Sequence, residues 1–155
     1  MTKIRGNEII ARMQTLRQPY YICIFICLRL IIGMVFMPFF VRLDKPIISP
    51  FNDNSDTFFN ALVIIVIGPL CETFFVQHLP FIVLLGKVRS RYVIIFSALV
   101  FSMLHTYSSI YIISAFFAGL VYSFAYWIKK DARPFVTVCL IHAGYNGFSF
   151  FWNNM

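Results

Sequence analysis

The 155-residue sequence contains little charge. Asp, Glu, Lys and Arg make up only 12% of it, whereas hydrophobic residues make up 60% and aromatic residues 19%. Soluble domains carry about 25% charged residues, and half that content cannot cover the surface of a soluble protein of this size. The composition therefore excludes most soluble enzymes, nucleic-acid-binding proteins and disordered tails. It predicts an integral membrane protein that binds no nucleic acid.

Several motifs of known membrane proteases and redox proteins are missing. There is no G-x-S-x-G serine motif, no pair of Asp residues in an apolar run and no H-E-x-x-H zinc motif, because His78 is followed by Leu79 and Pro80. The four cysteines form no C-x-x-C pair and lie in apolar runs. We interpret them as small buried side chains, not as a redox or disulfide site.

Long apolar runs dominate what is present. A helix needs about 20 apolar residues to cross a bilayer. Five runs meet or approach this length, and they cover residues 20–41, 57–86, 92–107, 110–128 and 134–152. We therefore predict an all-α polytopic bundle of about five transmembrane helices.

The second run is longer than a membrane requires. Its 30 residues extend about 45 Å as a helix, against a hydrocarbon core of about 30 Å. Pro69 and Pro80 lie inside it, so we expect a kink or a break. A polar, turn-prone loop over residues 42–56 precedes this helix.

The positive charges are distributed unevenly between the predicted loops. Ten of the 13 Lys and Arg residues fall on one side, in the amino-terminal segment and in the loops after the second and fourth spans. The positive-inside rule places that side in the cytoplasm. We divide the chain into a basic segment that can lie along the membrane surface (1–19), a first span with its loop (20–57) and a core (58–155).

Four polar residues inside the apolar runs stand out. Glu72 is the only acid within a span, and burying an acid there costs about 2.5–3.5 kcal/mol, so a function or a partner is expected. At 1.5 Å per residue, Glu72, His105 and Asn146 lie about 20–22 Å from the cytoplasmic basic clusters, and His142 about 13 Å. We expect these four to approach one another, whereas His78 faces elsewhere on its helix.

Helical spacing groups several of these residues into pairs. His142 with Asn146, Phe101 with His105, and Thr73 with Gln77 are all four residues apart and share a helix face. Gly144 and Gly147 beside His142 permit close approach of another helix. These two glycines are at least as typical of ordinary helix packing as of a functional site.

Two chemistries fit a carboxylate with two imidazoles and an amide. A Glu in an apolar site can act as a general base toward water, while an imidazole and an Asn stabilise an oxyanion. The same Glu with two His could instead hold zinc, which we regard as the weaker alternative. Arg29 is the other charge within a span. It is either a counter-ion for Glu72 or, in our preferred interpretation, a side chain that extends toward the membrane surface or contacts a loop carbonyl.

Three segments together resemble the CAAX prenyl protease and bacteriocin-processing family. Residues 68–77, GPLCETFFVQ, are similar to its first motif, a Pro followed by E-E-x-x-x-R. Residues 101–105, FSMLH, resemble its second motif, F-x-x-x-H, and residues 142–146, HAGYN, its third, H-x-x-x-N. The resemblance covers about residues 58–152 and leaves the first span outside.

The resemblance implies a metal-independent, glutamate-dependent intramembrane endopeptidase without a cofactor. In it, Glu72 activates water with His105 close by, and His142 and Asn146 form the oxyanion site, with Thr73, Gln77 and Phe101 in support. The second Glu and the Arg of the first motif are Thr73 and Gln77 here. We interpret this as a neutral hydrogen-bonded pair that replaces a charged one.

Two other functions remain open. A non-catalytic member could act as a bacteriocin immunity or scaffold protein, and a lone membrane Glu with His residues also suits a proton-coupled transporter. The expected partners are the lipid bilayer and a peptide or membrane-protein substrate, with self-association or a partner membrane protein to complete the walls of a short chain. A bacterial cytoplasmic membrane is the expected location.

Overall fold

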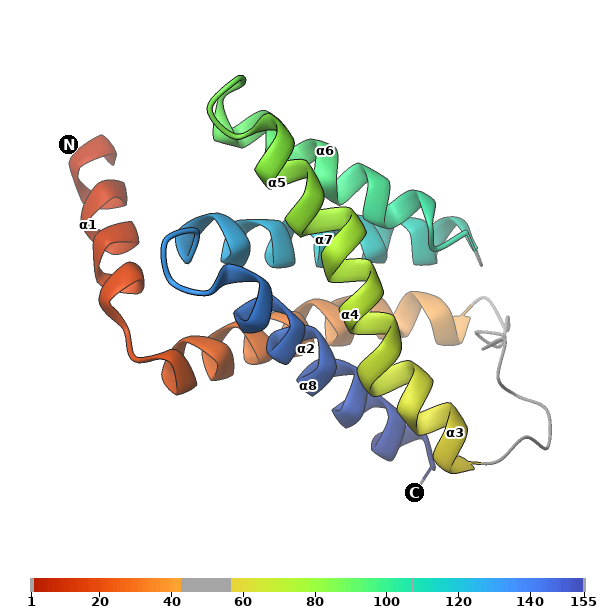
Figure 1. Cartoon of the computed structure of the whole chain (residues 1–155). Helices are drawn as coiled ribbons and strands as arrows, with labels where there is room; N and C mark the ends of the chain where they lie inside the picture. Colours follow the sequence, from red (N-terminus) through yellow and green to blue (C-terminus); the bar gives the residue numbers. More distant parts are fainter. Residues whose placement is uncertain (1, 43–56, 107, 155) are drawn as a thin grey trace.

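The computed structural model describes residues 2–42, 57–106 and 108–154. The polar loop predicted over residues 42–56 and the end of the third predicted span at Tyr107 lie almost wholly outside these ranges. The described residues form only helices and short connections (Figure 1). In chain order the elements are α1 (Thr2–Thr15), α2 (Gln18–Arg42), α3 (Thr57–Leu62), η1 (Val63–Ile67), α4 (Gly68–Glu72), η2 (Thr73–His78), α5 (Leu79–Leu84), α6 (Ser90–Met103), α7 (Ser109–Ile128) and α8 (Pro134–Asn154). The predicted all-α class is confirmed.

The elements α3 to α5 form one continuous long helix in which α-helical and π-helical turns alternate. The π turns η1 and η2 end immediately before the turns that contain Pro69 and Pro80. Before Pro69, the Gly68 amide bonds to the Val63 carbonyl, and before Pro80 the Leu79 amide bonds to the Phe74 carbonyl. A π turn widens the helix, so each proline fits without a break in the chain.

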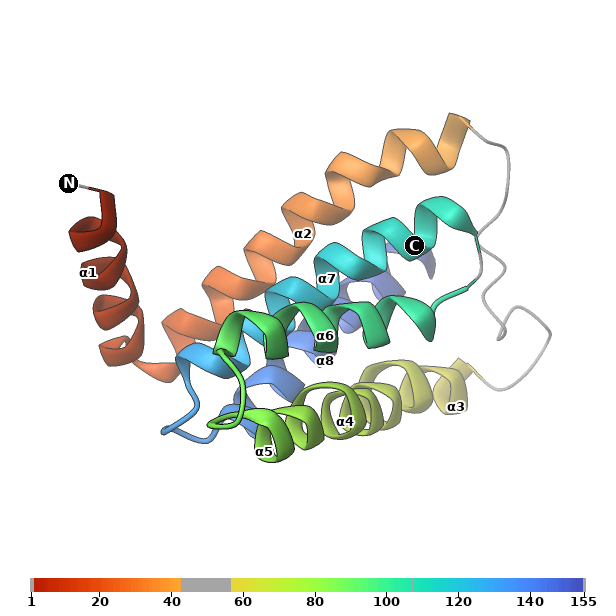
Figure 2. The same ribbon diagram turned by 90° about the horizontal axis from the view of Figure 1, so that it is seen from above.

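The helices α6 and α7 form the most intimate pair of the bundle. Gly119 of α7 makes this possible, because a Cβ atom at this position would lie 2.8 Å from the Ala98 Cα atom and 3.0 Å from the Phe101 Cβ atom of α6. Helices α2 and α8 pack against the other sides of α7 (Figure 2). The buried core therefore lies around α7, between the long helix on one side and α2 on the other.

Helix α1 stands apart from the bundle and touches it at its carboxyl end (Figures 1 and 2). The Lys129 Nζ atom donates to the carbonyls of Gln14 and Leu16, both at 2.9 Å, and lies 4.8 Å from the centre of the Tyr21 ring. Met13 and Leu16 pack against the core, whereas Ile9 is exposed. The end of α1 is thereby fixed beside the end of α7.

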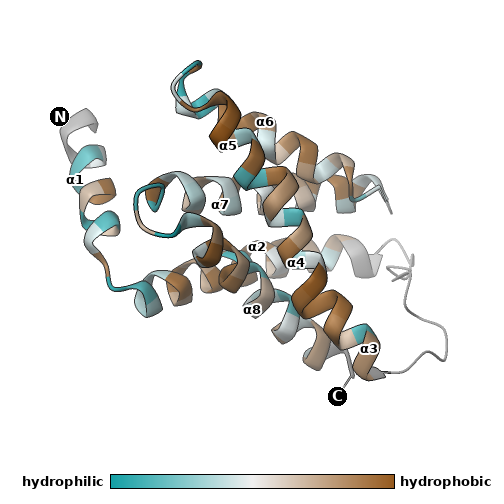
Figure 3. Cartoon of the chain, in the orientation of Figure 1, coloured by the Kyte–Doolittle hydropathy of each residue, from teal (hydrophilic) through white to brown (hydrophobic). Residues whose placement is uncertain are grey.

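In the part of the chain that the structure describes, three helices are long and apolar enough to cross a membrane, namely residues 18–39, 58–84 and 109–128. Apolar residues cover their outer faces (Figure 3). Helix α6 is apolar but has only 14 residues, because it ends at Met103 and not at Tyr107 as expected from the sequence. Helix α8 has 21 residues and carries His142 and Asn146. The chain is an integral membrane protein, and the count of five spans stays a prediction.

Candidate active site

Glu72, the last residue of α4, faces two histidines from two other parts of the bundle. Its Oε2 atom lies 3.8 Å from the His105 Nε2 atom and 3.7 Å from the His142 Nε2 atom. Both distances exceed a direct hydrogen bond but are short enough for the three side chains to contact one small group. The Glu72 side chain keeps 31% of its surface exposed, yet Oε2 is buried without a hydrogen-bond partner.

His105 lies just after α6 and is held by its backbone and by two aromatic rings. Its Nδ1 atom is 2.7 Å from the Phe101 carbonyl oxygen. The imidazole stacks on the Phe101 ring at 4.4 Å and on the Tyr111 ring at 5.7 Å between centroids. The predicted pairing of Phe101 with His105 is present, and it aims Nε2 at Glu72.

This hydrogen bond determines where the proton of neutral His105 resides. A carbonyl oxygen can only accept, so the Nδ1 atom carries the hydrogen and the Nε2 atom has a lone pair. An ionised Glu72 also presents only lone pairs. The two groups therefore need a shared proton, or a donor such as water between them, to interact favourably.

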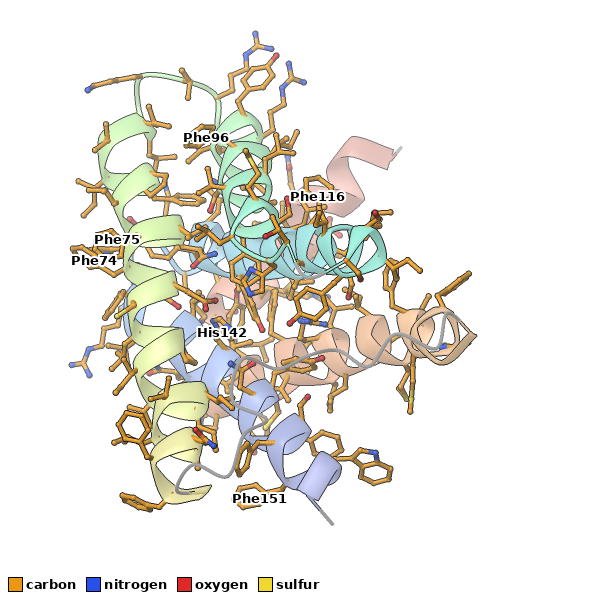
Figure 4. All side chains as sticks on the ribbon, turned by 90° about the vertical axis from the view of Figure 1, so that its right-hand side faces the viewer. Phe74, Phe75, Phe96, Phe116, His142 and Phe151 are labelled. Carbon is orange, nitrogen blue, oxygen red and sulfur yellow. The ribbon has the colours of Figure 1, made fainter. Side chains whose placement is uncertain are left out.

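His142 of α8 approaches Glu72 from the interior of the bundle (Figure 4). The residue is only 4% exposed, and its ring stacks on Tyr122 of α7 at 4.5 Å between centroids. The Phe101 ring meets it edge-on at 5.7 Å, so one phenyl ring contacts both histidines. Phe74 and Phe75, by contrast, point outward from the long helix in the same view.

Asn146 does not lie at the level of Glu72, contrary to the depths counted along the sequence. Its Nδ2 atom donates to the Ile64 carbonyl of η1 at 2.9 Å, and it is His142 that meets Glu72. The count of residues assumed that the end of α5 and the start of α8 lie at the same depth. It fails because α5 extends beyond the start of α8 (Figure 1). The Ile64 carbonyl lies five residues before Pro69, which has no amide to donate to it, and Asn146 satisfies it instead.

Thr73 and Gln77 do not form the hydrogen-bonded pair that we expected. Both side chains are completely buried in η2. However, the Thr73 Oγ1 atom and both polar atoms of the Gln77 amide have no hydrogen-bond partner. The segment between them is π-helical, so their spacing of four residues no longer equals about one helical turn.

Arg29 of α2 does not extend toward the membrane surface, which was our preferred interpretation. It is 9% exposed, and its guanidinium carbon lies 3.9 Å above the centre of the Tyr145 ring of α8. Tyr145 lies three residues after His142 on α8, so the guanidinium packs beside the helix that carries this histidine. Among the described residues it forms no ion pair, with Glu72 or any other acid.

Sequence reasoning missed the tyrosines of this site. Tyr122 stacks on His142, and Tyr145 covers Arg29. A single tyrosine in an apolar helix is a weak signal, because most such residues only fill the core. Tyr145 was easier to find from the sequence than Tyr122, because it lies between the two site candidates His142 and Asn146.

His78 faces away from Glu72, as predicted. Its Nδ1 atom lies 2.6 Å from the Tyr126 hydroxyl of α7, and its ring packs beside Phe74 and Phe135. It therefore belongs to the packing between the long helix and its neighbours.

The geometry of the described residues gives no support for a metal centre. Within residues 2–42, 57–106 and 108–154, no group of three or more His, Cys, Asp and Glu side chains is arranged to hold a metal ion.

The close approach of Gly144 to α2 is confirmed, because a Cβ atom there would lie 2.6 Å from the Ile26 Cδ1 atom. Gly147 is less tight, with ordinary contacts of 3.7 Å and more.

Comparison with known families gives one result that covers most of the bundle. The family model described as type II CAAX prenyl endopeptidase Rce1-like matches residues 54–148. These residues include the long helix, α6, α7 and most of α8, with Glu72, His105, His142 and Asn146. No curated protein and no solved structure matches the chain significantly. The chain belongs to the Rce1-like family of type II CAAX prenyl endopeptidases.

Proposed function

We propose that this protein is an intramembrane glutamic endopeptidase in which Glu72 activates the attacking water. The observation that carries the proposal is the approach of the Glu72 Oε2 atom to the Nε2 atoms of His105 and His142 at 3.8 and 3.7 Å. No other acid among the described residues lies in an apolar helix, since Glu8 and Asp131 are exposed. The family is one of endopeptidases, which fits this arrangement.

The reaction follows from the hydrogen-bonding needs of the site. A water molecule between Glu72 and His105 donates one hydrogen to each, because both present lone pairs. As the water oxygen attacks the peptide carbonyl, Glu72 takes its proton. When the carbon–nitrogen bond of the tetrahedral intermediate breaks, Glu72 returns that proton to the leaving amine.

Stabilisation of the oxyanion is assigned to His142 and Asn146. The Nε2 atom of His142 lies 3.7 Å from the Glu72 Oε2 atom, and in the tautomer with its hydrogen on Nε2 it can donate to the oxyanion. The Nδ2 atom of Asn146 donates one hydrogen to the Ile64 carbonyl and retains a second. Asn146 therefore contributes either that second hydrogen or the correct placement of η1 and α4 beside α8.

A comparison of membrane and secreted peptides by mass spectrometry tests the proposal. Cells express the wild type, Glu72→Gln or Glu8→Gln at matched levels. Glu8→Gln is the matched control, because it makes the same change at an exposed position on α1. We expect Glu72→Gln to lower product formation about 10²–10⁴-fold, the range for loss of a general base, while Glu8→Gln leaves it unchanged.

Unchanged cleavage by Glu72→Gln contradicts the proposal. The peptide identified in the wild type also gives the substrate and the scissile bond, and purified protein then shows whether cleavage is direct. Cleavage by the purified protein that persists in a chelator excludes the zinc alternative.

A second function, a non-catalytic immunity or scaffold protein, is favoured by one observation. The charged pair of the family's first motif is replaced by Thr73 and Gln77, whose polar atoms make no hydrogen bond. If Glu72→Gln retains full biological activity at matched expression, this function replaces the first. The endopeptidase proposal includes a peptide substrate and a location in a bacterial cytoplasmic membrane.

A further inference from the structure

Arg29 is the buried charge that the proposed reaction does not use. It lies on α2, outside residues 54–148 that match the family model. Helix α2 nevertheless packs against α7 and α8, which carry Tyr122 and His142. The guanidinium therefore enters the site from an element that the family motifs do not include.

The guanidinium packs against an aromatic ring, but no acid among the described residues forms an ion pair with it. The Tyr145 ring covers one of its faces, with the guanidinium carbon 3.9 Å from the ring centre. Its Nε and Nη1 atoms are buried and have no hydrogen-bond partner. A buried cation without an anionic partner is costly in a membrane, so a ligand that supplies the negative charge would stabilise this site.

The guanidinium and the Tyr145 ring pack closely against the backbone of α2. A Cβ atom at Gly33, one turn after Arg29, would lie 3.9 Å from Nη1 and 3.2 Å from the Tyr145 hydroxyl, so the absence of a side chain there lets both groups occupy this position. Of the acids in the described ranges, Glu72 contacts the two histidines, Glu8 is exposed, and Asp131 lies 4.0 Å from Lys130. None of them is the missing partner.

We propose that Arg29 binds a carboxylate of the substrate and thereby orients the peptide toward Glu72 and His142. This assignment rests on the proposed function and specifies its substrate class, an apolar peptide with a carboxylate near the reacting bond. A guanidinium suits this role because it presents several N–H groups in one plane and forms strong charge-assisted bonds with carboxylates. The carboxylate is either the free carboxyl terminus of the peptide or an acidic side chain.

Binding measured in the Glu72→Gln background tests this independently of cleavage. Three probes are compared in detergent: N-acetyl-Ile-Phe-Leu with a free carboxylate, its carboxyl-terminal amide, and the amide of N-acetyl-Ile-Glu-Leu. We expect one carboxylate peptide to bind at least about tenfold more tightly than the uncharged amide. The preference for the first probe identifies the terminus as the ligand, and preference for the third identifies a side chain.

Variants of Arg29 assign the preference to this residue. Arg29→Gln should reduce it to less than about twofold, whereas Arg29→Lys, which keeps the charge, should retain part of it. Arg17→Gln is the matched control, because Arg17 is exposed just before α2 and its loss should leave the preference intact. Thermal unfolding of each variant verifies folding, and Arg29→Lys alone decides the matter if Arg29→Gln does not fold.

Equal binding of all three peptides, or no binding of any, overturns the proposal. A carboxylate preference that survives Arg29→Gln overturns it as well. Because these measurements need no turnover, they leave the glutamic endopeptidase proposal untouched in either case. Conversely, loss of that proposal would not alter the binding comparison.

Discussion

Gln77 shows how much a single buried side chain can matter in this bundle. Its amide is completely buried and has no hydrogen-bond partner, so it carries a desolvation cost that no contact offsets. Gln77→Leu removes both polar atoms at similar volume. We expect the thermal unfolding midpoint of the purified protein to stay the same or to rise.

Ser97 provides the contrasting control for that prediction. Its hydroxyl donates to the Val76 carbonyl of η2 and accepts a hydrogen bond from the Ser123 hydroxyl at 2.8 Å. Ser97→Ala leaves both partners unpaired and should cost about 1–3 kcal/mol. If Gln77→Leu is the more destabilising of the two, then the Gln77 amide has a partner in the working protein.

The free-energy cost of placing polar groups in apolar helices explains which site residues could be predicted from the sequence. Glu72, His105 and His142 attract attention because ionisable groups are expensive in apolar helices, and the structure brings these three together. Asn146 was placed at the wrong level, since a residue count cannot reveal where two helices begin relative to each other. Arg29 was assigned to the surface because the length of its side chain permits either direction, and only packing against Tyr145 decides between them.

At the scale of whole elements, the contact between α6 and α7 depends on one glycine. Gly119→Ala would place a Cβ atom 2.8 Å from the backbone of Ala98, so the two helices must separate. We expect a loss of about 1–3 kcal/mol and lower activity, because α6 carries Phe101 and leads to His105. Unfolding and turnover measurements check both effects.

Gly147→Ala is the matched control for this change. It also adds one methyl group to a helix, but its nearest contact would be 3.7 Å from the Ile65 side chain. We therefore expect little change in stability. If both variants lose the same stability, then the close contact between α6 and α7 is not the reason that Gly119→Ala destabilises the protein.

The position of α1 depends on Lys129. Lys129→Met removes the two charged hydrogen bonds to the Gln14 and Leu16 carbonyls, each worth about 1.5–3 kcal/mol. The end of α1 should then open, and trypsin should cut after Arg17 several-fold faster. Lys130→Met, whose side chain is 41% exposed, should not change that rate. Equal rates for all three proteins would show that other contacts fix α1.

The helices were more predictable than their internal geometry. Apolar length and basic clusters give α2, α7 and α8 to within a few residues at each end. Pro69 and Pro80 indicate where the long helix is disturbed, but they do not distinguish a kink from a π turn. That choice depends on partners such as Asn146, which satisfies a carbonyl that the local sequence leaves unpaired.

For the whole molecule, the principal expectation concerns its orientation. Lys129 binds carbonyls at the end of α1, so the amino-terminal segment and the loop after α7 lie on one side of the membrane. Their positive charges predict that this side is cytoplasmic. In a cysteine-free background, Lys130→Cys should react with a membrane-impermeant maleimide only after the cells are permeabilised. Ser109→Cys should react in intact cells. The reverse pattern would invert the topology.

The short helix α6 has a consequence for the lipid around the protein. Fourteen residues rise about 21 Å, which leaves the turn with His105 roughly 9 Å short of the far face of a 30 Å hydrocarbon layer. Lipid tails beside this turn must shorten or give way to headgroups and water. We therefore expect the bilayer to be thinner beside His105, where the proposed hydrolysis needs water, and we expect a thicker membrane to slow the reaction by limiting access of water.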